Sequence, residues 1–535
     1  MIQNRVIWLY IILSCLSISV YYRVYSISQN ENLATVSDKQ SSYVLEVANQ
    51  RGEIYDCNFK PIVNVQDRYI AAIIPTPETI AAIMKYIDQE DKDDVINKIK
   101  EGKPFLTKVN DYNIYNDGIE IINIKERYQD NQLAPHIIGY INGDGDGVCG
   151  LEKVYDKFFK DNISKIKIKY QMNAWNKNYD QSLPTIERGD KYNKKGLVLT
   201  IDKRIQKIVE KSSKNILKGS ILVMDAQNGD IKGIASIPKY EPNNINKYLD
   251  DPNSPMLNRS FCAYNVGSTY KLIVASAALE EDYDKFINFK DTCNGYKQIS
   301  SNIFKCHFEA GHGKIGMKKA LEISCNPYFI DISLETGPIN ILNLSKKIGF
   351  GTYDVLAKDM VTNKGSLPDK STLLNKSDIA NLGFGQGELS ATPIQIAKMI
   401  AMISNDGYLV SPRLIKGISD KEGKYIETEE KYHSQARVIS KRTAQTLKDM
   451  MISVVENGSG KKAKPNRGGA GGKTASAQTG HYIDEKEIVH AWFAGFFPAS
   501  SPKYVVVILV EGGESGSNIA APIFKEISDN INLLT

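Results

Sequence analysis

The sequence is poor in cysteine, in net charge and in long apolar runs. Seven cysteines among 535 residues are too few for a disulfide scaffold. A formal net charge of +5, spread along the chain, gives no indication of a nucleic-acid partner. Hydrophobic residues make up 42% and charged residues 24%, which is typical of globular proteins with a substantial core. The length predicts two or three domains.

The one long apolar segment lies at the N-terminus. Val6 to Tyr22 carries no charge and is bounded by Arg5 and Arg23, and a run of this length is just long enough to cross a bilayer. A cleaved signal peptide usually has a shorter apolar region that ends in a small-x-small site. No convincing site of that kind is found here. We therefore predict that residues 1–28 form a cytoplasmic tail and a single transmembrane anchor of the cytoplasmic membrane, with the rest outside.

Residues 29–194 carry no group of side chains of catalytic type. The polar segment from about residue 26 to residue 50 predicts a stalk. Short strand-like and helix-like runs follow it, such as Tyr69–Ile74 and Glu78–Ile87. We expect this part to be a non-catalytic pedestal domain of the dimerisation type, with an irregular α+β structure.

A change of composition near residue 195 marks the second domain, which we place at 195–535. Its first two strand-like runs, Ser220–Asp225 and Ile231–Ile237, are separated by Asn228-Gly229, a strong hairpin signal. A mostly helical block follows over residues 265–460. The remaining strand-like runs are Gly472–Gln478, Val489–Phe497 and Tyr504–Glu511. We predict an α+β domain with a mainly antiparallel sheet of about five strands and an inserted helical block.

The first stretch with chemical character contains Ser268 and Lys271, followed by the apolar run Leu272–Leu279. That run is apolar nearly all the way round, as expected for a helix buried in a large domain. Gly267 would open the helix, and Lys271 would lie one turn above Ser268 on the same face. Burial disfavours the charged form of a lysine, and a neutral amine beside a serine hydroxyl is a nucleophile with its base. When only this Ser-x-x-Lys pattern is considered, a helix-capping serine and a surface lysine are the more common structure.

Two stretches further along the chain change that balance. Ser324 and Asn326 lie two apart on a bend, so both side chains can point the same way, to relay a proton and to hold a peptide carbonyl. Lys473, Thr474 and Ser476 follow two glycines, and small residues leave strand backbone open to an extended substrate. The lysine would present a fixed positive charge, and the hydroxyls would suit a carboxylate. Each stretch also has an ordinary alternative, a helix-to-loop turn or a glycine-rich loop before an edge strand.

In this order, the three stretches resemble the motifs of the serine acyltransferases that include penicillin-binding proteins and serine β-lactamases. Asn381–Ala397 and His490–Pro498 resemble two further segments of that family. Arg51–Asp56 and Gly150–Glu152 resemble landmarks of the non-catalytic module of class B penicillin-binding proteins. Over nearly its whole length the chain is similar to such a protein, with residues 195–535 as the penicilloyl-serine transpeptidase domain.

The resemblance implies a D,D-transpeptidase that cross-links peptidoglycan stem peptides outside the cytoplasmic membrane and binds β-lactam antibiotics. By motif, Ser268 attacks the carbonyl of the penultimate D-alanine and becomes acylated. Lys271 takes the proton of the serine, although the group that serves as base differs among relatives. Ser324 passes that proton to the leaving amine, and Asn326 holds the substrate amide.

The same resemblance implies substrate-binding roles on the third stretch. Lys473 and Thr474 would bind the terminal carboxylate, and the backbone N–H groups of Ser268 and Ser476 would form the oxyanion hole. The family usually has glycine where this chain has Ala475. The extra methyl could crowd substrate or drug, but it leaves the reactive groups in place. The reaction is expected to need no cofactor.

Two other functions fit parts of the sequence. A non-catalytic partner of a polytopic membrane glycan polymerase would dock through the anchor and the pedestal, and such docking can coexist with catalysis. A β-lactam sensor or class D-like hydrolase would share the three motifs, but the long pedestal and the anchor favour the biosynthetic enzyme. A class A protein is excluded, because no glycosyltransferase domain fits before residue 195. A role in elongation, division or sporulation is left open.

A second candidate site lies between the first two motifs. Cys293 and Cys306 occur there with two of the six histidines, His307 and His312. An exported protein favours a disulfide, and relatives often carry two cysteines at similar places. Zinc is the alternative, because it accepts thiolate, imidazole and carboxylate ligands in a tetrahedron. We expect either a disulfide or reduced pair, or a structural zinc held by Cys293, Cys306, Asp291 and one of the two histidines.

Overall fold

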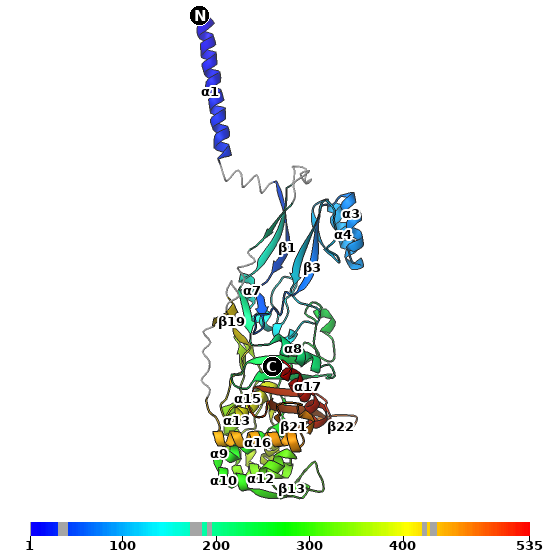
Figure 1. Cartoon of the computed structure of the whole chain (residues 1–535), viewed down its shortest axis with the longest axis vertical. Helices are drawn as coiled ribbons and strands as arrows, with labels where there is room; N and C mark the ends of the chain where they lie inside the picture. The colour runs from blue at the N-terminus through cyan, green and yellow to red at the C-terminus, as the bar shows by residue number, and fades with distance from the viewer. Residues whose placement is uncertain are drawn as a thin grey trace. The chain divides into compact units, whose positions relative to one another are not determined.

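The structure is a computed structural model, and it describes residues 2–29, 41–171, 184–189, 195–419, 425–427 and 436–534. The chain forms two compact units (Figure 1). The first unit is assembled from Met1–Arg51, Asn64–Arg127 and Asn162–Lys194. The second is assembled from Gly52–Val63, Tyr128–Asp161 and Lys195–Thr535. Both units are therefore discontinuous in sequence.

A single long helix, α1 (Ile2–Ser28), opens the chain. Its segment Gln3–Ser28 has a mean hydropathy of 1.6 and is not buried against other parts of the protein. Among the described residues it is the one helix long and apolar enough to cross a membrane. The helix extends past both Arg5 and Arg23, because residues 2–28 contain neither glycine nor proline.

The first unit is built on two three-stranded sheets, accompanied by helices α3 (Pro77–Ile83) and α4 (Lys92–Glu101). The first sheet has the order β1 (Ser42–Gln50), β6 (Ser164–Gln171), β7 (Thr185–Arg188). The second has the order β4 (Phe105–Val109), β3 (Gln66–Ile73), β5 (Ile119–Glu126). The predicted α+β character of this part is confirmed.

The predicted stalk is only partly correct. Residues 30–40 lie outside the described residues, but Ser42–Gln50 forms strand β1, which pairs antiparallel with β6 along its length. Tyr43, Leu45 and Val47 alternate along this strand and pack into the core of the first unit. Val44 and Glu46, which lie between them, are exposed on the other face of the strand.

The second unit takes up two segments that the sequence placed in the pedestal, Gly52–Val63 and Tyr128–Asp161. A four-stranded sheet explains the first of them, with the order β2 (Glu53–Tyr55), β8 (Gly196–Leu199), β19 (Ile415–Ser419), β20 (Tyr425–Glu427). The second segment carries the short helices α5 (Pro135–Ile138), α6 (Gly150–Val154) and α7 (Asp156–Asp161). Their apolar residues, such as Leu151, belong to the main core of this unit. The predicted single boundary at residue 195 is therefore wrong for these two segments, because the chain enters the second unit at Gly52, leaves it and returns.

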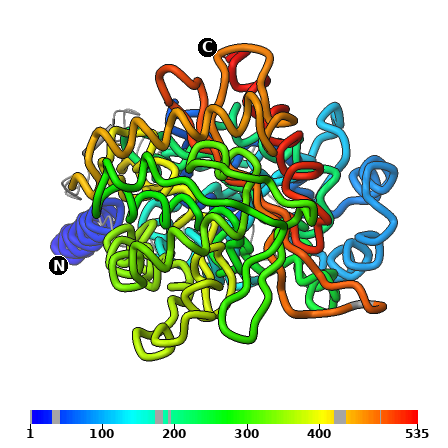
Figure 2. The backbone as a smooth tube through the Cα atoms, turned by 90° about the horizontal axis from the view of Figure 1, so that it is seen from below, coloured from blue at the N-terminus to red at the C-terminus, as the bar shows by residue number. Residues whose placement is uncertain are grey.

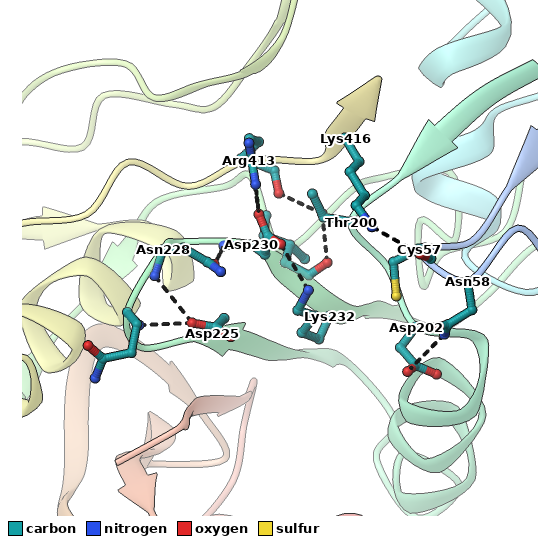
Figure 3. A network of polar contacts seen from close by, with 12 residues as sticks. Cys57, Asn58, Thr200, Asp202, Asp225, Asn228, Asp230, Lys232, Arg413 and Lys416 are labelled. Carbon is teal, nitrogen blue, oxygen red and sulfur yellow. Dashed lines mark hydrogen bonds and ion pairs between the residues drawn. The ribbon is translucent and has the colours of Figure 1, made fainter. Parts of the chain in front are cut away.

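Polar contacts fix the segment that precedes α8 (Lys203–Ser212) within the second unit (Figure 3). Lys416 donates to the backbone oxygen of Cys57 at 3.2 Å, and Asn58 donates to Asp202 at 3.2 Å. Close by, Asp230 accepts hydrogen bonds from Arg413 at 2.8 Å and from Lys232 at 2.9 Å (Figure 3). This network is structural, since Asp202 and Asp230 pair with Arg204 and Arg413, and Lys416 donates to a backbone oxygen.

A five-stranded antiparallel sheet forms the centre of the second unit, and the hairpin predicted at Asn228-Gly229 is confirmed. The order is β10 (Ile231–Ile237), β9 (Gly219–Asp225), β23 (Tyr504–Val510), β22 (Lys486–Phe497), β21 (Gly471–Ile483). Alternate residues of β23 enter the two cores on opposite faces, Val507 on one and Ile508 on the other. Helices α8 and α17 (Ala521–Asn532) cover one face, and α15 (Pro393–Ser404) and α16 (Lys441–Asn457) pack on the other.

The helical block surrounds α9 (Lys271–Glu281), of which every residue from Lys271 to Leu279 is buried. The block also contains α10 (Tyr283–Asn288), α11 (Met317–Glu322), α12 (Asn326–Thr336), α13 (Pro338–Ile348) and α14 (Lys376–Gly383), which lie together in Figure 2. It is not purely helical. In the part of the block that the structure describes, four small two-stranded sheets interrupt it: β11 (Tyr264–Asn265) with β18 (Ser390–Ala391), β12 (Lys290–Cys293) with β15 (Gly313–Gly316), β13 (Tyr296–Ile299) with β14 (Asn302–Lys305), and β16 (Val355–Ala357) with β17 (Met360–Val361).

Candidate active site

Ser268 lies in a short 3₁₀ turn, η4 (Gly267–Thr269), that leads directly into α9. Gly267 has a φ of 52°, and a Cβ added there would lie 3.0 Å from Ala477 of β21. The glycine therefore lets the turn approach the edge strand of the central sheet. Asn265 donates to the carbonyl oxygen of Gln478 at 2.8 Å, which ties the same segment to β21. These contacts bring the first motif beside the third.

The amine of Lys271 points at the second motif. It donates to the carbonyl oxygen of Ser324 and to Oδ1 of Asn326, each at 2.7 Å, and lies 3.3 Å from Oγ of Ser324. The side chain is fully buried. Burial lowers the pKa of Lys271 to about 7, against a smaller opposing effect of the Cys325 and Cys306 thiols. An amine with this pKa is partly neutral at pH 7 and can accept a proton.

A second buried lysine reaches the same hydroxyl. Nζ of Lys473 lies 2.8 Å from Oγ of Ser324 and 2.8 Å from the carbonyl oxygen of Thr474. Burial, together with the charge of Lys271, lowers the pKa of Lys473 well below its usual range. The fixed positive charge expected from the sequence is therefore disfavoured in the free protein, and a bound carboxylate would restore it.

Ser324 itself has an unusual backbone conformation. Its φ is 57°, in the left-handed region that residues other than glycine rarely occupy. The strained position lies between α11 and α12 and turns the Ser324 hydroxyl toward both lysines. Backbone strain of this kind is concentrated at functional sites.

The other predicted residues lie around this centre. Asn326 donates through Nδ2 to the carbonyl oxygen of Lys305 at 3.2 Å, so its amide is held at both ends. Ser476 is exposed on β21, and its Oγ accepts a hydrogen bond from the backbone N–H of Gly516 at 3.3 Å. Thr474 is buried.

Ser459 was not among the predicted site residues, and its hydroxyl lies 2.7 Å from that of Thr474. Gly458 makes this possible, because a Cβ there would lie 2.4 Å from the carbonyl oxygen of Glu322 in α11. A serine between Gly458 and Gly460 was the available signal. Ser459 thus orients one of the two groups expected to meet the substrate carboxylate.

Ala475, the departure from the family pattern, does not project into open space. Its side chain is 3% exposed and packs in the same hydrophobic core as Ala477 and Trp492. The crowding expected from its methyl group is therefore directed at the core of the unit rather than at solvent.

The cysteine-rich segment brings together a set that differs from the predicted one. Cys293, Cys306, His312 and Cys325 place one sulfur or nitrogen atom each within 4.8 Å of one another. All seven cysteines are free thiols in the structure, so among the alternatives expected for Cys293 and Cys306 the disulfide is not formed, and the reduced pair and the metal site are left. Cys325 was missed, although it stands in the middle of the second motif.

Asp291 and His307 are not members of this group. Asp291 lies against Asp331 instead, and burial together with that contact raises the pKa of Asp331 to about 7. Nδ1 of His307 lies 3.9 Å from Sγ of Cys306, at the margin of the group. The hydrogen bond between the Cys325 and Cys306 thiols lowers the pKa of Cys306 and raises that of Cys325, which favours a thiolate on Cys306.

Comparison with known proteins identifies the family. The family model "Penicillin binding protein transpeptidase domain" matches residues 219–529. Among curated proteins, Stage V sporulation protein D of Bacillus subtilis is 27% identical over 93% of this chain and 80% of its own length. Peptidoglycan D,D-transpeptidase MrdA of Escherichia coli is 25% identical over 93% of this chain and 89% of its own length.

Solved structures show the same fold. The Penicillin-Binding Protein (PBP2) from Helicobacter pylori has a TM-score of 0.69 at 23% identity, and the match covers 92% of this chain and 99% of that one. The D,D-transpeptidase domain of a peptidoglycan glycosyltransferase from Eggerthella lenta has a TM-score of 0.65 at 19% identity, covering 91% and 98%. With an apolar N-terminal helix and a separate α+β unit beside the matched domain, the chain belongs to the penicillin-binding proteins and is a class B member of that family.

Proposed function

We propose that this protein is a peptidoglycan D,D-transpeptidase that works through an acyl-enzyme on Ser268. The observation that carries the proposal is the convergence of two buried lysines, Lys271 and Lys473, on the hydroxyl of Ser324. The names of the curated relatives support the reaction class.

The acylation step uses the neutral form of Lys271. Oγ of Ser268 attacks the carbonyl carbon of the penultimate D-alanine of one stem peptide, while Lys271 takes the hydroxyl proton. The backbone N–H groups of Ser268 and Ser476 bind the developing oxyanion, a contribution of about 3–4 kcal/mol per donor in well-studied hydrolases. Ser324 passes a proton to the departing amine, and the C–N bond breaks. Free D-alanine is released, and the rest of the stem peptide remains bound to Ser268 as an ester.

The second half of the reaction reverses these proton transfers. The amine of a second stem peptide attacks the ester carbonyl, a new amide bond forms, and the Ser268 hydroxyl is regenerated. Asn326 holds the amide of the donor peptide, while Lys473 and Thr474 hold its terminal carboxylate during acylation. A β-lactam enters the same site because its ring-amide carbonyl and its separate carboxylate have an arrangement similar to that of the scissile carbonyl and the terminal carboxylate of the stem peptide.

The proposal includes the membrane setting. Helix α1 would anchor the chain in the cytoplasmic membrane as a single span, with both compact units outside, where peptidoglycan lies. A polytopic membrane glycan polymerase would be the partner that supplies uncross-linked strands. The PBP2 of Helicobacter pylori, which has a similar fold, has a solved structure in complex with MreC, and this supports the expectation of a protein partner.

A fluorescent penicillin tests the nucleophile. The full-length protein in detergent should be labelled on Ser268, and Ser268→Ala should abolish the label. Labelling that survives in this variant would move the nucleophile elsewhere.

Turnover of the bound label separates the alternatives. A transpeptidase keeps the penicilloyl group for a long time, whereas a class D-like hydrolase releases it quickly. Cross-linking of a two-peptide substrate, followed by mass spectrometry, then distinguishes an enzyme from a sensor or from a non-catalytic polymerase partner.

A further inference from the structure

The loop between β12 and α11 is folded tightly so that four potential ligands meet. Cys293 pairs with Gly313 in the β12–β15 ladder, next to His312. Gly295 and Gly311 have φ values of 88° and 78°. A Cβ at Gly311 would lie 2.3 Å from the carbonyl oxygen of Cys293. Only glycine allows this approach, which brings His312 beside the cysteines.

The donor atoms have the spacing that a tetrahedral metal requires. Sγ of Cys306 lies 3.6 Å from Nδ1 of His312. With Zn–S near 2.3 Å and Zn–N near 2.05 Å, two ligands of a tetrahedral zinc are separated by roughly 3.5–3.8 Å. The other two ligand atoms lie within 4.8 Å, so closure around an ion needs only small side-chain movements.

The chemistry of the set points to zinc rather than to a disulfide. Cys293, Cys306 and Cys325 are 2%, 4% and 0% exposed. A disulfide would use two of these thiols and would leave the third, with His312, buried beside it. Three thiolates and one imidazole form a closed structural zinc set of the Cys₃His type. We propose that Cys293, Cys306, His312 and Cys325 bind one structural zinc ion.

The metal site is continuous with the active site. Cys325 is the middle residue of the second motif, between Ser324 and Asn326, whose side chains contact Lys271. Cys306 follows Lys305, whose carbonyl oxygen accepts the hydrogen bond from Asn326. Two of the four ligands are therefore bonded directly to residues that touch or shape the catalytic centre.

Zinc would thus act as a positioning group for the second motif, and this step rests on the proposed function. It would hold the strained bend at Ser324, with its φ of 57°, against relaxation to a commoner backbone conformation. It takes no part in bond making. The expected effect of its loss is slower acylation of Ser268, because the bend that carries Ser324 and Asn326 would no longer be held in place.

Metal analysis of the full chain, purified without chelator or histidine tag, tests the site. The expected result is about one zinc per chain, lost in His312→Ala and in Cys306→Ser. Two matched controls should keep the metal. His307→Ala removes the neighbouring imidazole. Cys57→Ser removes a thiol that is not part of the cluster and lies in the polar network with Asn58 and Asp202 (Figure 3). Zinc that persists in His312→Ala and Cys306→Ser would overturn the assignment, as would a metal-free protein with fewer than seven titratable thiols.

Cobalt(II) provides a readout that does not depend on the folding of variants. Exchanged into the wild-type protein, it should give the strong thiolate-to-cobalt absorption of a sulfur-rich tetrahedral site. Absence of that absorption in a cobalt-loaded sample would overturn the proposal.

The positioning role has a separate test. Wild-type protein stripped of zinc should acylate with penicillin on the order of tenfold more slowly, with unchanged circular dichroism, and added zinc should restore the rate. An unchanged acylation rate after zinc removal would overturn the positioning role but would not contradict the zinc site itself. A protein that binds zinc but never acylates would instead refute the proposed function and leave the metal site standing.

Discussion

Two buried lysines of the second unit differ in their partners, and the difference separates the lysine that we propose as a base from one that is held in an ion pair. Lys398 in α15 pairs with Asp354 at 2.6 Å, and the two side chains are 8% and 7% exposed. Lys271 is as deeply buried, but its acceptors are a carbonyl oxygen of Ser324 and the amide oxygen of Asn326, both uncharged. A carboxylate stabilises the ammonium form and a neutral dipole does so much less. Burial therefore lowers the pKa of Lys271 to about 7.

Burial alone is thus no sign of catalysis. A buried ion pair holds two segments together, and its removal on one side leaves an unpaired charge in the core. A buried lysine without a counter-charge is costly in its charged form, so it gives up its proton near neutral pH. The second lysine of the site, Lys473, follows the same rule, because burial and the charge of Lys271 both lower its pKa.

Replacing Lys271 should have the largest effect and should spare the fold. Lys271→Met keeps the volume of the side chain and removes the proton acceptor. We expect acylation by penicillin to fall about 10²–10⁴-fold, the usual range for a general base. The second-order rate of labelling measures this, and the melting temperature checks the fold. If Lys271→Met is unfolded under the conditions of the labelling assay, Lys271 has a structural role, and its contrast with Lys398 does not hold.

Replacing Lys398 should give the opposite outcome. Lys398→Met leaves Asp354 buried and unpaired, and we expect a loss of about 3–5 kcal/mol in the free energy of unfolding. The folded fraction should still acylate at the wild-type rate. Urea unfolding and active-site titration measure the two quantities.

The double variant Lys398→Met with Asp354→Leu provides the matched control for that pair. It should recover most of the stability, because a buried ion pair is often replaced by apolar residues without loss. If the double variant is no more stable than Lys398→Met, the pair has a role beyond mutual compensation.

The pH dependence should report the free amine. With the pKa of Lys271 at about 7, the neutral fraction rises with pH and reaches one half near pH 7. Below this pKa, the neutral fraction of Lys271 falls about tenfold for each unit by which the pH is lowered, so the acylation rate should also fall about tenfold per pH unit. Stopped-flow labelling between pH 5 and pH 9, roughly the range around that pKa, measures the profile. A rate independent of pH would mean that another group accepts the proton.

The contacts within the first two motifs of the candidate site were predictable because their residues are local in sequence. Ser268 and Lys271 lie one helical turn apart, and Ser324 and Asn326 flank a single bend, so short patterns contain most of the geometry. The five-stranded sheet was predictable for the same reason, since hairpin and strand signals are local. What no local pattern shows is the convergence of Lys473 on Ser324, which depends on the edge position of β21.

The cysteine cluster and the unit boundaries depend on contacts between distant segments. Cys325 was read only as the middle of a motif, because nothing near it in sequence indicates that Cys293 and His312 fold back onto it. Likewise, β2 pairs with β8 across more than a hundred residues, so its membership of the second unit is invisible to composition. Long-range pairing of this kind is decided by the assembled core.

The smallest predicted effect concerns Ala475, which we expect to support the fold, as Lys398 does, rather than the reaction. The residue is 3% exposed and belongs to the same hydrophobic core as Ala477 and Trp492, while the groups proposed to bind the substrate lie on Lys473, Thr474 and Ser476. Ala475→Gly should therefore lower the free energy of unfolding by about 0.5–1 kcal/mol, from lost packing and added chain entropy. Acylation by penicillin should be unchanged or somewhat faster. Parallel urea unfolding and labelling rates test both parts. A marked slowing of acylation would show that the methyl group supports the geometry of β21 at the substrate and belongs with the catalytic groups.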